Sequence, residues 1–200
     1  MCIAAVILAA GKATRMGSVK QLLPYKGTTL LQHVIKQVEV SDVNYISCVL
    51  GANFQVLKHT LTNHSVTVID NQKWELGLSS SISVAVTHLK TLQPLPEGVL
   101  FLLADQPHVD SDYINKIINC FKNNNGKIVA SNYANGHGVP ALFPAVYYDA
   151  LLNLKGDKGA KLFLVNHKER VISIKTSSED VLFDVDTPKD YNKLVKGKSE

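Results

Sequence analysis

The chain has 200 residues, of which 46% are hydrophobic, and its 21 Lys and Arg residues against 17 Asp and Glu residues give a net charge of +4. This length is typical of one compact domain, and we expect a single domain over residues 1–200. The basic residues are spread along the chain, with no run that indicates nucleic-acid binding. No apolar stretch reaches the roughly 20 residues needed to cross a bilayer, and the first residues lack the features of a signal peptide. We therefore expect a cytoplasmic protein that binds neither nucleic acid nor membranes.

The cysteines and histidines give no sign of a cross-link or a zinc centre. Cys2, Cys48 and Cys120 are odd in number and form no CxxC pair, and the seven histidines form no HExxH motif. These spacings argue against a disulfide framework and against a zinc site. Cys48 and Cys120 lie in apolar segments, where we expect them to be small core residues.

Apolar runs alternate with segments of helical periodicity. Residues 3–8 form a continuous apolar run that ends before Gly11, which is typical of a strand buried on both faces. The same reasoning predicts further strands at 45–50, 66–69, 99–103, 127–130, 171–174 and 181–185. It predicts helices at 30–40, 53–62, 78–92, 111–121, 144–154 and 160–165. Residues 132–142 are rich in Gly, Asn and Pro and are predicted to be a loop.

A last helix is predicted after residue 186. Thr187 can cap it, Pro188 suits its first position, and Asp190 favours its first turn. The alternating order predicts a three-layer α/β/α domain with a mostly parallel sheet. Ligands of such sheets bind beyond the carboxyl ends of the strands, so the residues directly after 8, 69, 103 and 185 are candidate site residues.

The loop after the first predicted strand combines small residues with cations. It begins Leu8-Ala9-Ala10-Gly11 and carries Lys12, Arg15 and Lys20. Small residues let backbone N–H groups approach a phosphate, and the cations neutralise it. Neither a GxGxxG nor a Walker A pattern is present. An ordinary strand-to-helix connection with solvated charges is the alternative interpretation.

Two aspartates are expected at the ligand edge of the sheet. Asp105 directly follows the strand predicted at 99–103, and Asp186 follows the one predicted at 181–185. Residues two apart on a strand share a face, which also places Asp184 with Asp186. Mg²⁺ is commonly held by one or two protein carboxylates and by substrate phosphates. Alternatively, Asp105 caps the turn before Pro107, and Asp186 belongs to a helix start.

A glycine followed by serines lies at the start of the helix predicted from residue 78. In Trp74-Glu75-Leu76-Gly77-Leu78-Ser79-Ser80-Ser81, the N–H groups and hydroxyls can contact a base, a ribose or a phosphate. Simple capping by one serine is the alternative, and it places the helix start near these residues.

Six segments, taken in order, resemble the MobA-like nucleotidyltransferases, and specifically the molybdenum cofactor cytidylyltransferase branch. They are Leu8–Gly11 with Arg15–Gly17 and Lys20–Pro24, Trp74 with Gly77–Ser81, Leu103–Pro107, Gly138–Phe143, Gly156–Ala160, and Asp184–Pro188. The resemblance runs from about Val6 to Tyr191. Each segment is a weak signal, so the specificity comes from their order.

The resemblance implies a fold like the nucleotide-binding half of GT-A glycosyltransferases. It also implies transfer of a nucleoside monophosphate from an NTP to a phosphorylated acceptor, with release of pyrophosphate. By the same resemblance, Arg15, Lys20 and Asp105 are catalytic, and Asp105 and Asp186 hold Mg²⁺. The implied nucleotide-binding residues are Leu8, Ala9, Ala10, Gly11, Arg15, Lys20, Gly77, Ser79 and Ser81.

The resemblance further points to particular substrates. The Ala9-Ala10 pair is similar to the pyrimidine-using branch, which implies CTP, whereas guanylyl-transferring relatives tend to have glycine at the second position. Residues 135–140 and 157–158 would face the acceptor, expected to be the molybdopterin molybdenum cofactor, and a molybdenum hydroxylase is a candidate partner. Lys12-Ala13 departs from relatives that often carry serine there.

Two other functions fit the same residues. One is a nucleotidyltransferase for a sugar phosphate or another alcohol phosphate. The other is a non-catalytic chaperone that delivers a finished molybdenum cofactor to a molybdenum hydroxylase. The transfer chemistry itself needs alignment and charge neutralisation rather than a covalent nucleophile, and no GxSxG motif indicates one.

Overall fold

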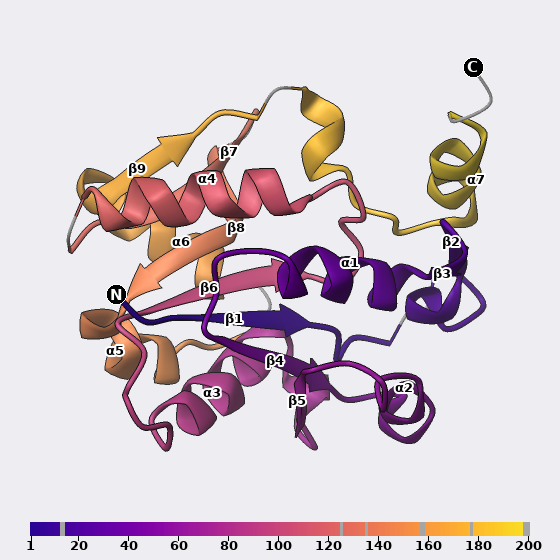
Figure 1. Ribbon diagram of the computed structural model, residues 1–200, viewed down its shortest axis with the longest axis horizontal. Helices are drawn as coiled ribbons and strands as arrows, with labels where there is room; N and C mark the ends of the chain where they lie inside the picture. The colour runs from indigo at the N-terminus through magenta and orange to yellow at the C-terminus, as the bar shows by residue number, and fades with distance from the viewer. Residues whose placement is uncertain (13–14, 125, 135, 157–158, 177, 198–200) are drawn as a thin grey trace.

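In the computed structural model of the chain, the described residues are 1–200 without 13–14, 125, 135, 157–158, 177 and 198–200. A seven-stranded sheet in the order β5-β4-β1-β6-β8-β7-β9 forms its centre (Figure 1). The parallel strands of its first part are β1 (Ile3–Leu8), β4 (Tyr45–Leu50), β5 (Thr67–Asp70) and β6 (Gly98–Leu103). Their carboxyl ends therefore meet at one edge, as predicted.

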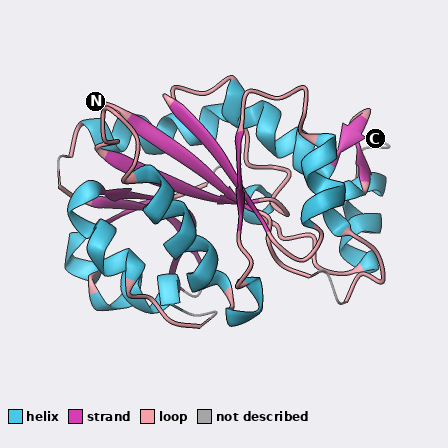
Figure 2. Ribbon diagram, turned by 90° about the horizontal axis from the view of Figure 1, so that it is seen from below, coloured by secondary structure: helices cyan, strands magenta, loops and turns pink. Residues whose placement is uncertain are grey.

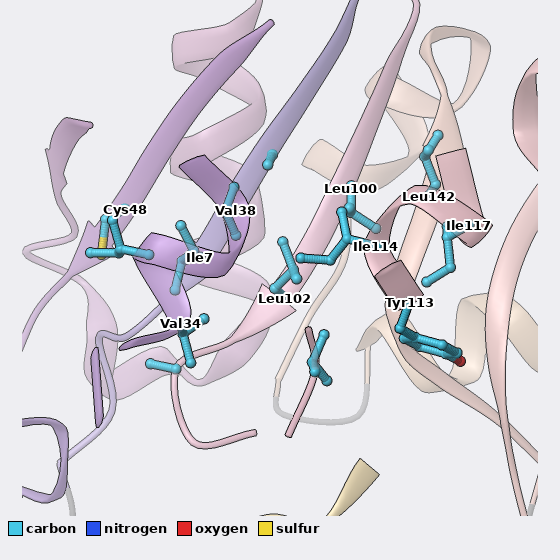
Figure 3. Close-up of a cluster of buried hydrophobic side chains, with 14 of the residues drawn as sticks. Ile7, Val34, Val38, Cys48, Leu100, Leu102, Tyr113, Ile114, Ile117 and Leu142 are labelled. Atoms are coloured by element: carbon cyan, nitrogen blue, oxygen red, sulfur yellow. The ribbon is translucent and has the colours of Figure 1, made fainter. Parts of the chain in front are cut away.

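Helices cover both faces of the sheet, which confirms the three-layer architecture (Figure 2). One face packs against α1 (Leu30–Glu39), α2 (Phe54–Thr60) and α4 (Ser111–Lys122). The other face packs against α3 (Leu78–Leu89), α5 (Tyr148–Leu152) and α6 (Gly159–Asn166). Alternate β1 side chains enter the two cores, with Ile7 among the residues of the first (Figure 3). All six residues of β1 are buried, which explains its unbroken apolar sequence.

The second part of the sheet differs from the sequence prediction. β7 (Ile128–Tyr133) and β8 (Gly136–Pro144) form an antiparallel pair, and β9 (Val171–Ile174) lies parallel to β7. The predicted loop at 132–142 was wrong, because β8 pairs with β6 on one side and β7 on the other. These two ladders satisfy backbone groups in a segment whose composition disfavours a strand.

The strand predicted at 181–185 was also wrong. Glu179–Leu182 is a 3₁₀ helix, and the chain then crosses the end of β6. Val185 N–H donates to the Asp105 carbonyl oxygen at 2.9 Å, outside the ladders of the sheet. The mostly apolar segment Val181–Val185 resembles a buried strand, but its first residues belong to the 3₁₀ helix and Val185 bonds to Asp105, beyond the end of β6.

Local helix signals were more accurate. The last helix, α7 (Pro188–Lys196), has Thr187 as its cap and a reciprocal capping box with Asp190, as predicted. α3 begins at Leu78, next to the serines, but its cap is Gly77 with a φ of 91° rather than a serine.

A short hairpin, β2 (Pro24–Tyr25) and β3 (Thr28–Thr29), packs beside α7 and was not predicted (Figure 1). Within the described part of the chain, no helix has the length and apolar character required to traverse a bilayer.

Candidate functional site

The ends of β1 and β6 place the two main site segments side by side. Leu8 and Leu103 are partners in the parallel register, and Ala104 N–H donates to the Leu8 carbonyl oxygen at 3.2 Å. On the other side of β1, Ala9 N–H donates to the Val49 carbonyl oxygen at 2.9 Å. The small-residue loop after β1 therefore lies directly next to Asp105, as the sheet rule predicted.

A buried glutamine shapes this loop. The Gln21 side chain is buried, and its Nε2 donates to the carbonyl oxygens of Ala9 at 3.1 Å and Gly11 at 3.3 Å. These bonds fold the chain back over its own start and bring the preceding residue, Lys20, to Asp105. Sequence reasoning gave Gln21 no role, although an amide directly before the apolar pair Leu22-Leu23 was an available signal.

Four charged side chains converge at the edge of the sheet. Lys20 Nζ donates to the Asp105 carboxylate and, at 3.0 Å, to Asp186 Oδ1. Arg15 Nη2 lies 3.1 Å from Asp186 Oδ2. The Lys20 and Asp105 side chains are only 16% and 17% exposed, whereas that of Arg15 is 69% exposed. The structure thus brings together all four residues predicted to serve catalysis and metal binding.

The cluster fixes the charge state of Lys20. Burial alone would lower the pKa of this ammonium, but the Asp105 carboxylate, aided by Asp186, outweighs burial and raises the pKa. Lys20 is therefore a permanent cation at neutral pH. It can neutralise either the carboxylates or a phosphate group that enters the site.

The oxygen atoms of the cluster fit a hard divalent cation. Asp105 Oδ1 is buried and, among the described residues, has no hydrogen-bond donor. Asp186 lies close enough to share the Lys20 ammonium with Asp105. The described residues contain no group of three or more His, Cys, Asp or Glu side chains suited to a metal. Two carboxylates completed by water and phosphate oxygens is the arrangement that Mg²⁺ prefers.

A third carboxylate adds negative charge next to this pair. Much of Asp184 is exposed, but its carboxylate faces Gln106 and the Asp105 carboxylate. Partial burial, together with repulsion from Asp105, raises the pKa of Asp184 to about 6. The resulting field favours a cation at this edge.

Two adjoining cavities extend from the cluster, and both are lined by Leu8, Gly11, Lys12 and Leu78. One, of about 230 Å³, also contains the charged cluster, Ala9 and Gln21. The other, of about 630 Å³, is lined further by Ala10, Trp74, Glu75, Gly77 and Ser81. Of the predicted nucleotide-binding residues, Ser79 lies apart: it is buried, and its N–H donates to the Gly156 carbonyl oxygen at 3.3 Å.

Two further residues that shape the larger cavity were not predicted. Asn71 is buried, and its Nδ2 donates to the hydroxyls of Ser80 and Ser81 at 2.9 Å each. A Cβ atom on Gly51 would lie 2.6 Å from Trp74 Cβ and 2.8 Å from the Ala10 carbonyl oxygen, so only glycine fits there. Both residues directly follow strands, which is the sequence signal that could have found them.

Of the segments predicted to face the acceptor, 135–140 and 157–158, the structure describes residues 136–140. Residues 135 and 157–158 lie outside the described residues. His137, Gly138 and Val139 line a third cavity, of about 360 Å³, together with Tyr133 and Asp184. Leu78 lines this cavity and also both cavities next to the charged cluster, so the three adjoin.

Comparison with known proteins identifies the family that builds this site. The pattern of the MobA-like NTP transferase domain matches residues 5–171. The chain belongs to the MobA-like NTP transferase family. It is thus an NTP nucleotidyltransferase by family, with a loop after β1 and an aspartate after β6 at the edge where the cavities meet.

Curated proteins that are similar to this chain carry names with different activities. Nicotine blue oxidoreductase of Paenarthrobacter nicotinovorans is 28% identical, and the alignment covers 97% of each chain. Purine catabolism protein PucB of Bacillus subtilis is 26% identical over 97% of this chain and 96% of its own. Molybdenum cofactor cytidylyltransferase of Escherichia coli is 27% identical over 93% of this chain and 92% of its own. Such similar identities do not distinguish one acceptor from another.

Solved structures show the same fold. The crystal structure of Rv0371c from Mycobacterium tuberculosis H37Rv is 28% identical, covers 98% of both chains and superposes with a TM-score of 0.82. A manganese complex of Rv0371c is 27% identical, with a TM-score of 0.76 over 98% of this chain and 99% of that chain. A divalent metal therefore binds to a protein of this fold.

Proposed function

We propose that this chain is a Mg²⁺-dependent cytidylyltransferase that moves CMP from CTP to the phosphate of the molybdopterin molybdenum cofactor, releasing pyrophosphate. The observation that carries the proposal is the convergence of Arg15, Lys20, Asp105 and Asp186 beside the small-residue loop. The choice of acceptor rests on the resemblance of the six segments to the molybdenum cofactor cytidylyltransferase branch, and the E. coli enzyme of that name is one of several similarly related proteins.

The residues present suit attack of a phosphate oxygen on the α-phosphorus. A new P–O bond forms, and the bond from the α-phosphorus to the bridging oxygen of pyrophosphate breaks, so the electron pair leaves with pyrophosphate. An acceptor phosphate dianion is already a nucleophile and needs no general base. Lys20 and Arg15 stabilise the charge that develops on pyrophosphate. A Mg²⁺ ion held by Asp105 and Asp186, when bound, supplies further neutralisation of the phosphate oxygens.

The Ala10 side chain supports the choice of cytosine as the base. Ala10 and Trp74 line the same cavity, and the Ala10 main chain is fixed by its carbonyl bond from Ala52 N–H at 3.0 Å. A methyl group at this position leaves less room than a hydrogen, which favours a pyrimidine over a purine. The Ala9-Ala10 resemblance points to the same choice.

The charged cluster also bears on the other functions. A sugar-phosphate nucleotidyltransferase would use the same cluster and differ only in the acceptor. A cofactor chaperone would need neither Lys20 nor the carboxylate pair for chemistry. An oxidoreductase, the activity in the name of the P. nicotinovorans relative, would need a redox partner rather than a released pyrophosphate.

Pyrophosphate release separates these functions. The purified protein is incubated with Mg²⁺ and CTP, GTP or ATP, with and without molybdenum-loaded molybdopterin, and Asp105→Asn serves as the inactive control. We expect acceptor-dependent pyrophosphate release that is fastest with CTP. Faster turnover with GTP would overturn the base assignment, and turnover with a sugar phosphate instead would overturn the acceptor. Cofactor binding without pyrophosphate release would establish the chaperone.

A further inference from the structure

We propose that Gln106 is a positioning residue that sets the Asp184–Asp186 segment against Asp105 and connects it to the β7–β8 hairpin. The inference rests on the proposed function, because it assigns Asp105 and Asp186 to one metal site. Gln106 directly follows Asp105, and it is 1% exposed.

Both protons of the Gln106 amide are committed to other parts of the fold. Its Nε2 donates to Asp184 Oδ1 at 2.9 Å and to the Tyr133 hydroxyl at 2.7 Å. A primary amide has two donor protons, so these bonds use its whole donor capacity. Its Oε1 is buried and, among the described residues, accepts no hydrogen bond. The side chain therefore acts entirely through the bonds it donates.

The Tyr133 hydroxyl links Gln106 to β8, the strand that carries residues predicted to face the acceptor. Because its oxygen accepts from Gln106, its own proton is free to donate, and it donates to the Val139 carbonyl oxygen. Burial strongly raises the pKa of Tyr133, which keeps the hydroxyl protonated and fixes this direction. Tyr133 and Val139 belong to β7 and β8 and line the third cavity with Asp184.

Gln106 and Asp105 hold consecutive residues of one crossing segment. The Gln106 amide binds the Asp184 side chain, and the Asp105 carbonyl oxygen accepts from Val185 N–H at 2.9 Å. Asp186, the next residue, carries the carboxylate that meets Lys20. One bond alone would let the segment pivot, whereas two bonds fix its orientation. Without the amide, Asp184 would also lose the hydrogen bond that offsets part of its repulsion from the Asp105 carboxylate.

A second buried network on the same hairpin offers a matched control. The Tyr113 hydroxyl donates to Ser131 Oγ at 2.9 Å, and Ser131 Oγ donates to the Pro140 carbonyl oxygen at 2.7 Å. This network ends on the residue after Val139 and on the Ile174 carbonyl oxygen, and none of these hydrogen bonds involves Asp184. Tyr113→Phe thus removes a buried hydroxyl comparable to that of Tyr133 without touching the proposed connection.

The test is the affinity for Mn²⁺ in the presence of CTP, measured by electron paramagnetic resonance on the wild type, Gln106→Met, Tyr133→Phe and Tyr113→Phe. Met preserves length and removes both donated bonds. We expect Gln106→Met to weaken Mn²⁺ binding by about 10- to 100-fold, the usual cost of losing a group that orients metal ligands. Tyr133→Phe leaves the bond to Asp184 in place, so its loss should be smaller. Tyr113→Phe should bind Mn²⁺ like the wild type.

The outcomes separate this inference from the proposed function. Tight Mn²⁺ binding by the wild type with unchanged binding by Gln106→Met would overturn the positioning role alone. A wild type that fails to bind Mn²⁺ with CTP would overturn both proposals. Equal weakening by Tyr113→Phe and Tyr133→Phe would show general loosening of the hairpin and would also overturn the role. If Gln106→Met does not fold, the comparison of the two tyrosine variants decides the matter.

Discussion

The two parts of the sheet contribute to the site in different ways. In the parallel part, β1 and β6 end at one edge, where the small residues Ala9 and Gly11 lie beside Lys20 and Asp105. In the mixed part, the antiparallel hairpin of β7 and β8 presents side chains such as Tyr133 and His137. Parallel strands bring successive loops to one edge whatever their side chains. A hairpin places a given side chain there only if its register is set correctly.

This contrast assigns general and specific tasks to the two parts. The parallel part can bind phosphate and metal through main-chain groups, Lys20 and Asp105. The hairpin and the Asp184–Asp186 crossing depend on a chain of particular bonds through Gln106. We therefore expect substitutions in the parallel part to affect all substrates, and substitutions in the hairpin to affect the acceptor most.

The largest effect is expected from neutralising a metal carboxylate. Asp105→Asn and Asp186→Asn should each lower kcat by about 1,000-fold or more, the upper end of the loss for one preorganised charge contact, because each also weakens the metal site. The fold should persist, because asparagine keeps the shape. Asp110→Asn is the control: Asp110 caps α4 through Tyr113 N–H, and asparagine caps equally well. Steady-state kinetics at limiting Mg²⁺ checks this, and near-normal activity of either variant would remove that residue from the metal site.

Removal of the central cation should come next. Lys20→Ala should lower kcat by about 100- to 1,000-fold, because an ammonium that stabilises pyrophosphate is lost. Lys20→Arg should rescue only in part, since a planar guanidinium does not replace a compact ammonium. Without nucleotide, Lys20→Ala should bind Mn²⁺ more tightly than the wild type, because the ammonium no longer competes for Asp105 and Asp186.

The exposed Lys36 of α1 supplies the control for this variant, as Lys36→Ala should change neither kcat nor Mn²⁺ binding. An unchanged kcat in Lys20→Ala would exclude Lys20 from the reaction. A large fall in melting temperature with modest loss of kcat would make its role structural instead.

Alanine substitutions at Gly51, after the parallel strand β4, and at Gly138, in the hairpin strand β8, compare the two parts of the sheet. A Cβ on Gly51 would meet the Ala10 carbonyl oxygen at 2.8 Å, whereas a Cβ on Gly138 would meet the Tyr133 ring at 2.7 Å. Main chain cannot move aside as a ring can, so Gly51→Ala should cost about 1–3 kcal/mol of stability and raise the KM for CTP several-fold. Gly138→Ala should cost less and leave that KM unchanged. Thermal melts and CTP kinetics on both variants check this, and a larger CTP effect at Gly138 would reverse the assignment of the two parts.

The smallest effect compares two capping boxes. Thr29 pairs with Gln32 at the start of α1, and Thr187 pairs with Asp190 at the start of α7. At neutral pH, Thr29→Ala and Thr187→Ala should each lower the free energy of unfolding by about 1 kcal/mol. Denaturant titrations at several pH values check this and separate the boxes, because only one of them contains a titratable group.

The pH dependence follows from Asp190. The hydrogen bond from the Thr187 hydroxyl holds the pKa of Asp190 below its ordinary value. Because its pKa is lowered, ionised Asp190 stabilises the fold at pH values above the ordinary carboxyl pKa of about 4. This stabilisation is lost as the pH falls through the lowered pKa. The difference in free energy of unfolding between Thr187→Ala and the wild type should therefore become smaller as the pH falls. The corresponding difference for Thr29→Ala should stay the same. The same pH dependence of stability in both variants would contradict the assignment of the lowered Asp190 pKa to the Thr187 hydrogen bond.

The sequence by itself determined the parts of the structure that depend on local chemistry. The unbroken apolar run Ile3–Leu8 specified a buried strand, and Thr187-Pro188 with Asp190 specified the start of α7. Burial periodicity and capping act within a few residues, so a single sequence reveals them. The order of strands and helices likewise predicted the three layers and the edge at which Asp105 lies.

Only the tertiary structure decided what depends on distant partners. β8 exists because β6 and β7 pair with it, which the Gly-rich residues 136–144 could not indicate. Residues 181–185 had the apolar character of a strand but cross the end of β6 instead. Lys20 meets carboxylates that lie 85 and 166 residues further along the chain, and Gln106 meets Asp184. Such contacts cost loop-closure entropy that only the whole packed fold offsets, and so no local pattern records them.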